Sequence, residues 1–184
     1  MKRIFFIIIV VFVLVAAFFF LKNEANAPQI EQSNISRNMK ITSSAFLAGE
    51  MIPEKYTCQG ENVNPPLNIE GVPENANSLV LIVDDPDAPV GTWTHWTLWD
   101  IPLSVSSIDE NSVPEGGVEG VTSFGEAGYG GPCPPSGTHR YFFKLYALDS
   151  LLEVGPETPV DDLVKEMDGH VLDRAELIGL YEKK

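Results

Sequence analysis

Two carboxylates are held close together in residues 85–89 (DPDAP), directly after the apolar run 78–83 (SLVLIV). The two prolines stiffen this turn, so Asp85 and Asp87 are fixed at the end of a predicted strand. Carboxylates in such a place can orient a neighbouring imidazole or take part in proton transfer. Because Asp and Pro are also ordinary turn residues, two solvated acids in a tight turn are the alternative.

Two histidines occur in segments with the composition of strands. Residues i and i+2 share a strand face, so Trp93 and His95 point the same way. His139 and Tyr141 likewise share one face, and Arg140 points to the other, where it could pair with an acid of the turn. A single strand histidine is also commonly a packed, hydrogen-bonded residue, and Arg140 could be a plain surface charge.

Brought together, these groups would suit an anion. A carboxylate beside two imidazoles favours the charged form, so at least one histidine would stay cationic. An imidazolium, the Tyr141 hydroxyl and the backbone N–H groups of residues 130–137 (GGPCPPSG) are all donors for phosphate oxygens. We expect Asp85 to orient a histidine rather than to contact the anion. His170, after Gly169, is expected to be structural or exposed.

The elements that must position these residues are short apolar runs punctuated by Gly and Pro. The run 78–83 suits a central strand buried on both faces. Residues 92–101 (TWTHWTLWDI) and 139–148 (HRYFFKLYAL) predict two more strands, and the second alternates between apolar and polar positions. Residues 41–46 are a weaker candidate.

The C-terminal part predicts at least one helix. Residues 161–167 (DDLVKEM) fit a helix whose first-turn acids offset the positive end of the dipole. Residues 175–181 fit either a second helix or a last strand, because their periodicity does not decide. These patterns predict a mainly antiparallel β domain over residues 39–184, with one or two small helices near its C-terminus.

The N-terminus has a different character. Lys2 and Arg3 precede an apolar run of 18 residues, from 4 to 21, and a membrane-spanning helix takes roughly 17–25 residues. We expect residues 1–22 to be a membrane anchor or a cleaved signal peptide, followed by a flexible tether over residues 23–38. Either reading makes the domain extracytoplasmic, held at the membrane by the N-terminal helix or secreted.

The charge balance excludes one class of partner. The chain has 12 basic against 26 acidic residues, a formal charge of −14. Residues 1–22 hold three of the basic residues and no acid, which leaves −17 on the remainder. A nucleic-acid partner is excluded, because a phosphate backbone needs a basic footprint. No cofactor is implied.

Cys58 and Cys133 are the two cysteines of the chain. An even number of cysteines in an exported domain favours a disulfide, and two unpaired thiols are the alternative. A bridge would close a long loop, which stabilises a fold by roughly 4–5 kcal/mol in the chain-entropy model.

These pieces, in this order, resemble the phosphatidylethanolamine-binding protein family, and especially its bacterial and archaeal Raf-kinase-inhibitor-like (YbhB/YbcL-like) branch. The resemblance covers about residues 40–183. Its blocks are residues 56–58 (YTC), 62–67 (NVNPPL), 84–89 (DDPDAP), 95–96 (HW), 134–141 (PPSGTHRY) and 175–179 (AELIG). The DPDAP and GTHRY blocks at their observed separation are the specific part of the match.

The resemblance implies a mainly β fold of two antiparallel sheets with a small C-terminal helical part. It also implies one pocket for a small anion, such as phosphate, acetate or the head group of a phospholipid. Carried over by position, the ligand-binding residues would be Asp85, His95, His139 and Tyr141, framed by Pro86, Asp87, Trp93 and the loop from Gly131 to Pro135.

Three functions compete on this basis. The leading one is a non-enzymatic binding module for an anion, tethered to a membrane by the N-terminal segment, with a second role as a protein inhibitor. The alternative is a hydrolase such as a phosphoesterase, with the His and Asp residues as metal ligands or as acid and base. No HExxH, GxSxG or Cys–His nucleophile pattern supports it. A secreted protease inhibitor acting through a surface loop is the third.

Overall fold

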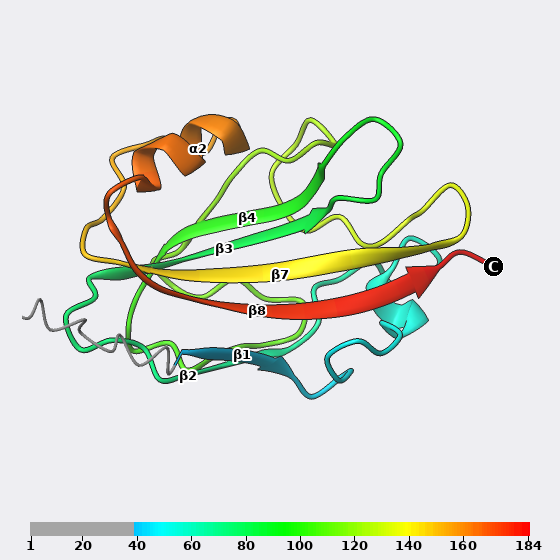
Figure 1. Ribbon diagram of the computed structural model, residues 1–184, viewed down its shortest axis with the longest axis horizontal. Coiled ribbons are helices and arrows are strands. Elements are labelled where there is room, and N and C mark those ends of the chain that lie inside the picture. Colours follow the sequence, from blue (N-terminus) through cyan, green and yellow to red (C-terminus); the bar gives the residue numbers. More distant parts are fainter. Residues whose placement is uncertain (1–38) are drawn as a thin grey trace, which may run out of the picture. The chain divides into compact units, whose positions relative to one another are not determined.

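The computed structural model describes residues 39–184, which form two antiparallel β-sheets (Figure 1). The smaller sheet has the strand order β1-β2-β5 and the larger one β6-β4-β3-β7-β8. The predicted fold class, mainly β with two antiparallel sheets, is confirmed, and this part of the chain has one α-helix, α2 (Val160–Met167). The expected anchor (1–22) and tether (23–38) lie outside the described residues.

The three long strands predicted from composition are confirmed to within a few residues. The strands are β1 (Lys40–Ser43), β2 (Leu67–Glu70), β3 (Ser78–Asp85), β4 (Trp93–Ile101), β5 (Ser107–Ile108), β6 (Val118–Glu119), β7 (Thr138–Leu148) and β8 (Val171–Glu182), and η1 (Glu54–Tyr56) is a 3₁₀ turn. The segment 175–181, which fitted a helix or a strand, belongs to β8, because it pairs with β7 along its whole length.

β3 is the centre of the larger sheet and is buried at every position. Leu79, Leu81 and Val83 pack into the core that the two sheets enclose. Val80 and Ile82 point to the opposite face, where α2 covers them with Leu163 and Met167. Because both faces are covered, the strand is apolar without alternation from residue 79 to residue 83, and its acidic side chains appear at its C-terminal end.

β7 shows the opposite pattern, with alternating burial. His139, Tyr141, Phe143 and Leu145 are buried on the core side. The even-numbered residues from 140 to 146 lie on the outer face and are exposed or half-buried. Since successive side chains of a strand point to opposite faces, this one strand contributes to two separate surfaces.

The predicted membrane-anchored, extracytoplasmic location is corrected by the structure. Within residues 39–184 no helix is long and apolar enough to cross a membrane. The single α-helix there has eight residues and therefore rises about 12 Å, whereas the hydrocarbon core of a bilayer is about 30 Å thick. The prediction rested on residues 1–22, which are not among the described residues, and we do not carry this location forward.

Candidate functional site

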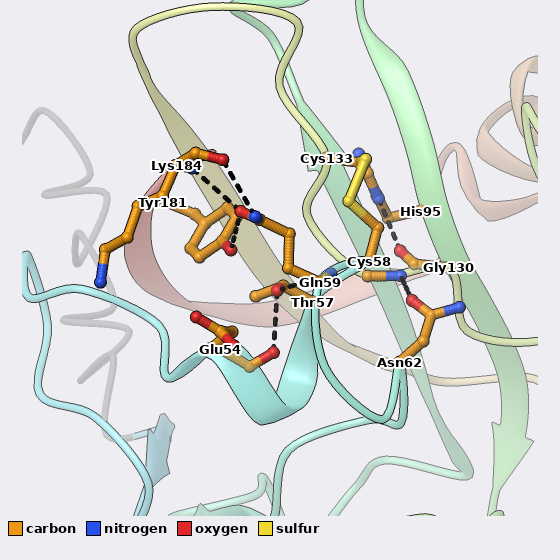
Figure 2. Close-up of a disulfide and its surroundings, with 11 residues drawn as sticks. Glu54, Thr57, Cys58, Gln59, Asn62, His95, Gly130, Cys133, Tyr181 and Lys184 are labelled. Atoms are coloured by element: carbon orange, nitrogen blue, oxygen red, sulfur yellow. Dashed lines mark hydrogen bonds between the residues drawn. A yellow bond between two sulfur atoms is a disulfide. The ribbon is translucent and has the colours of Figure 1, made fainter.

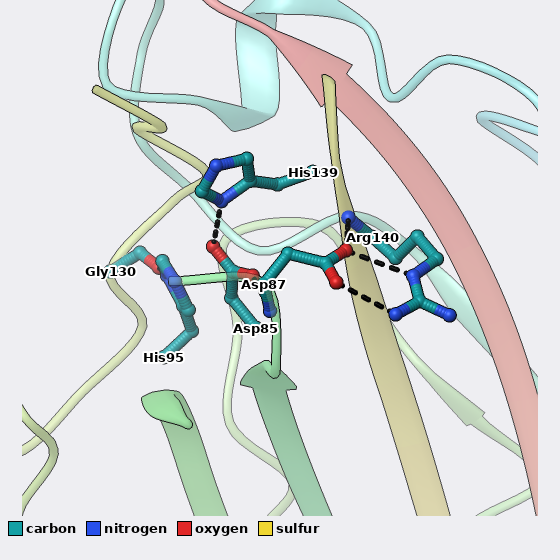
Figure 3. A network of polar contacts seen from close by, with 6 residues as sticks. All are labelled: Asp85, Asp87, His95, Gly130, His139 and Arg140. Carbon is teal, nitrogen blue, oxygen red and sulfur yellow. Dashed lines mark hydrogen bonds and ion pairs between the residues drawn. The ribbon is translucent and has the colours of Figure 1, made fainter. Parts of the chain in front are cut away.

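Asp85 and His139 meet where β3 ends and β7 begins. The two strands are antiparallel neighbours, so these ends lie side by side. His139 Nδ1 donates to Asp85 Oδ2 at 2.7 Å, and the backbone N–H of Asp87 donates to Asp85 Oδ1 at 2.8 Å (Figure 3). Asp85 and His139 are only 3% and 7% exposed. Each carboxylate oxygen of Asp85 therefore accepts one hydrogen bond, and the contact with His139 fixes the orientation of that ring.

His95 is held by the Gly-rich loop rather than by a carboxylate. Its Nδ1 lies 2.6 Å from the carbonyl oxygen of Gly130. A carbonyl only accepts hydrogen bonds, so Nδ1 carries the proton. Burial lowers the pKa of His95. The hydrogen bond to Gly130 and the charge of Asp85 raise it, but by less, so the pKa stays below its ordinary value. The imidazole is therefore neutral at pH 7, and its Nε2 is an acceptor.

Aromatic rings enclose His95. The Tyr141 ring lies edge-on to it at 5.2 Å, and the Phe124 ring does so at 5.4 Å. Phe124 also contacts Trp93 edge-on at 5.5 Å. The Tyr141 hydroxyl is buried and forms no hydrogen bond of good geometry within the described part of the chain, although Asp85 and the backbone of Cys133 lie near enough to affect its pKa. Burial raises the pKa of this phenol, which keeps the hydroxyl protonated as a donor.

The loop beside His95 is tied to the segment that follows η1. The N–H of Gly131 donates to Asn62 Oδ1 at 2.8 Å, and a disulfide joins Cys58 to Cys133 (Figure 2). Gly131 is required, because a Cβ there would lie 2.6 Å from the carbonyl oxygen of Tyr56. The position of Gly130, and with it the orientation of His95, therefore depends on this tie.

A small cavity of about 200 Å³ lies along the same loop. Gly130, Gly131 and Phe124 contribute to its wall, together with the disulfide. None of Asp85, His95, His139 and Tyr141 is among its lining residues. The cavity is therefore connected with these side chains only through the Gly130–Gly131 loop and Phe124.

Three of the predicted framing residues point elsewhere. Asp87 turns to the outer face, where its carboxylate pairs with Arg140 at 2.7 Å, which confirms the expected pairing of Arg140 with the acidic turn. Arg140 lowers the pKa of Asp87 to about 2. Pro86 lines a groove on the outer face, and Pro135 is exposed. Within residues 39–184, no group of three or more His, Cys, Asp or Glu side chains is placed to hold a metal ion.

Three contributors to the site were not anticipated from the sequence. Phe124 sits half-exposed in a turn, and nothing in its sequence neighbourhood distinguishes it. Gly130 has no room for a side chain, because a Cβ would lie 2.2 Å from the Phe124 ring. In the sequence, the pair of glycines at 130 and 131 is the one feature that indicates this close approach. Asn62 has a positive φ of 58°, a conformation that asparagine tolerates better than most residues.

The buried His95 predicts a specific dependence of stability on pH. Because burial lowers its pKa in the folded state, the unfolded chain, with a histidine pKa of about 6.5, binds this proton more readily. The free energy of unfolding should therefore fall as the pH is lowered through about 6.5 towards the folded pKa. Urea unfolding of the full chain at pH 7.5 and 5.5 measures this.

The His95→Gln variant should lose part of that dependence. The matched control is His170→Gln, since His170 is an exposed histidine paired with Asp149. Identical changes of unfolding free energy with pH in the wild type and in His95→Gln would contradict the role of burial at His95.

Residues 42–182 match the family model described as phosphatidylethanolamine-binding protein. Among curated proteins, the chain is 49% identical over 150 residues to a UPF0098 protein of Methanothermobacter thermautotrophicus, covering 79% of this chain and 99% of the relative. A UPF0098 protein of Pyrococcus abyssi is 52% identical over 151 residues, covering 77% of this chain and 84% of that relative.

Two solved structures are similar over the same region. One is a phosphatidylethanolamine-binding protein homologue from Chlamydia trachomatis, with a TM-score of 0.77 and 44% identity, covering 80% of this chain and 99% of the homologue. The other is YbcL of Escherichia coli, with a TM-score of 0.76 and 32% identity at the same coverage, 80% and 99%. Both agree with the two-sheet fold described above.

Proposed function

The chain belongs to the phosphatidylethanolamine-binding protein family, and we propose that it is a non-enzymatic binding protein for phosphate or the phosphoryl group of a larger ligand. The proposed site consists of Asp85, His95, His139 and Tyr141. The observation that carries the proposal is the buried Tyr141 hydroxyl, which lacks a partner in residues 39–184 and lies on the same strand face as His139. A buried donor without a partner costs free energy, which a ligand oxygen would recover.

The charges of the site support an anion. His139 donates Nδ1–H to Asp85, so the ring nitrogen left for a ligand is Nε2, which is a donor when the imidazole is charged. Tyr141 adds a neutral hydroxyl donor. His95, being neutral, offers its Nε2 as an acceptor, which suits a protonated phosphate oxygen.

The proposal assigns Asp85 a positioning role. Each of its oxygens accepts a hydrogen bond, one from His139 and one from the backbone of Asp87. These two contacts fix the orientation of the carboxylate and, through it, that of the His139 ring.

Anion affinity is expected to fall as the pH rises from 5 to 8. A histidine ordinarily loses its charge in this range, and His139 in its neutral form is a weaker donor for an anion. Isothermal titration calorimetry of the full chain with inorganic phosphate measures this. Sulfate, whose charge does not change over the same range, separates the titration of the protein from that of phosphate.

The His139→Gln variant should bind phosphate more weakly and should lose the pH dependence. The His170→Gln variant is the control, because it removes an exposed histidine far from the acidic turn in the sequence. A flat pH profile for both anions in the wild-type chain, or wild-type affinity in His139→Gln, would overturn the proposed site.

A further inference from the structure

A groove on the outer face of β7 and β8 takes no part in the site described above. It has a volume of about 660 Å³ and is lined by the even-numbered residues of β7 from Arg140 to Tyr146 and by Arg174 and Glu176 of β8. This volume falls in the range of roughly 300–1,000 Å³ that small-molecule sites occupy. His139 and Tyr141 point to the opposite face of β7, so the groove and the His–Asp site are separated by the sheet.

The groove gathers the positive charge of an acidic protein. Eight basic residues fall within residues 39–184: Lys40, Lys55, Arg140, Lys144, Lys165, Arg174, Lys183 and Lys184. Three of them, Arg140, Lys144 and Arg174, line this groove. In a chain with a formal charge of −14, such a local cluster is where an anion would be least opposed by the field of the protein.

Two of these cations are held in place. Arg140 donates to Asp87 through Nε and Nη2, at 2.9 and 2.7 Å, and Lys144 Nζ donates to Asp84 Oδ2 at 2.6 Å. Both cations also lie over the Phe142 ring, at 5.5 and 5.4 Å from its centroid. Donors that are already ordered lose less conformational entropy when a ligand binds.

The third cation, Arg174, is exposed and forms no ion pair with any residue between 39 and 184. It lies opposite Tyr146 in the pairing of β7 with β8. Glu176 lies opposite Lys144, two residues further along the same strand. The free guanidinium of Arg174 is therefore the natural partner for a ligand anion, and Glu176 opposes a ligand that carries several negative charges.

The groove continues into a more apolar one at Tyr146. This second groove, of about 630 Å³, runs past the C-terminal end of α2 and is lined by Val164, Met167 and Val171, together with Lys165, Asp168 and Gly169. Val164 and Val171 are 49% and 43% exposed. Cationic and apolar groups thus follow one another along one face of the sheet.

We propose that the two grooves form a single site for an amphiphilic anion, a molecule with one anionic group and an apolar part. The anionic group binds between Arg174 and Lys144, and the apolar part lies along Tyr146 towards Val164 and Val171. Burying the apolar part contributes about 25 cal/mol for each Å² removed from water, and the cations select its orientation.

The test uses naphthalene-2-sulfonate and decanoate as planar and linear amphiphilic anions, with the full chain. Isothermal titration calorimetry should detect both, and Arg174→Gln should weaken binding of both by about tenfold or more, as expected for a hydrogen bond to a charged group. Lys183→Gln is the matched control, because it removes one exposed positive charge outside the groove. Arg174 is exposed, so Arg174→Gln should keep the wild-type melting temperature.

Each result decides the proposal. Amide chemical-shift changes that centre on Tyr146 and Arg174, together with unchanged binding in His139→Gln, would support a site separate from the His–Asp pair. Equal affinity of the wild type and Arg174→Gln, or equal losses in Arg174→Gln and Lys183→Gln, would overturn it. Shift changes in the groove caused by inorganic phosphate at the same affinity would show that the apolar part of the ligand is not recognised.

Discussion

The Asp85→Asn variant should bind phosphate about 10- to 100-fold more weakly than the wild type at pH 6. Asparagine can still accept the N–H of Asp87 through its oxygen, but it then presents an NH₂ group to His139 Nδ1. That nitrogen must become an acceptor, so His139 is held neutral. Removing a hydrogen bond to a charged group costs about 1.5–3 kcal/mol, and about 1.4 kcal/mol corresponds to a tenfold change in affinity.

The same variant should also lose the pH dependence of binding, which a merely structural role of Asp85 would not predict. The chain offers a close control in Asp149→Asn. Asp149 accepts from His170 Nδ1 at 2.7 Å, the same length as the pair at Asp85, but both side chains are about half exposed. Calorimetry of the two variants from pH 5 to 8 makes the comparison. Retention of the wild-type pH profile by Asp85→Asn would rule out His139 as the titrating donor.

Removing the disulfide should lower the free energy of unfolding by about 4–5 kcal/mol. Cys58 and Cys133 are separated by 75 residues, and the chain-entropy model assigns about 4.5 kcal/mol to closing a loop of that length. Both cysteines are exposed, so a Cys58→Ser, Cys133→Ser double variant buries no new polar group. Urea unfolding of the full chain, with and without the bridge, measures the difference.

The corresponding double alanine variant serves as the control for side-chain chemistry. If the loss comes from loop closure, the serine and alanine variants should be destabilised equally, and chemical reduction of the wild type should match both. A loss below about 1 kcal/mol in both double variants would contradict the loop-closure explanation. The hydrogen bonds around the loop, such as that from Gly131 to Asn62, would then be enough to keep the folded loop in place without the bridge.

The long strands could be predicted from the sequence because their own composition determines them. The run that became β3 is apolar from residue 79 to residue 83 since both of its faces are covered, and β7 alternates because one of its faces is not. The segment 175–181 could not be assigned in this way. Its apolar residues fit both periods, and what makes it a strand is the pairing with β7, which is a contact between distant parts of the chain.

The candidate site, like the fold, could be predicted from the sequence only in part. Alternation along β7 was enough to place Arg140 opposite to His139, but it left open whether Arg140 pairs with the acidic turn, as it does with Asp87, or is a plain surface charge. The Asp85–His139 contact joins residues 54 positions apart, and only the family resemblance pointed to it. The neutral state of His95 could not be predicted, because it depends on burial, and its tautomer depends on a carbonyl group 35 residues away. The half-exposed position of Phe124 beside it is likewise a product of the folded loop.

The alternation of β7 has a consequence for how this protein can diverge. Mutations at even positions from 140 to 146 alter the outer groove, and mutations at 139 and 141 alter the surroundings of the Asp85–His139 pair, so the side chains of either surface can change without altering the other. A single-residue insertion or deletion within the strand would instead exchange the two sets of side chains. Relatives should therefore vary freely in the chemistry of one face while keeping the length of this strand unchanged.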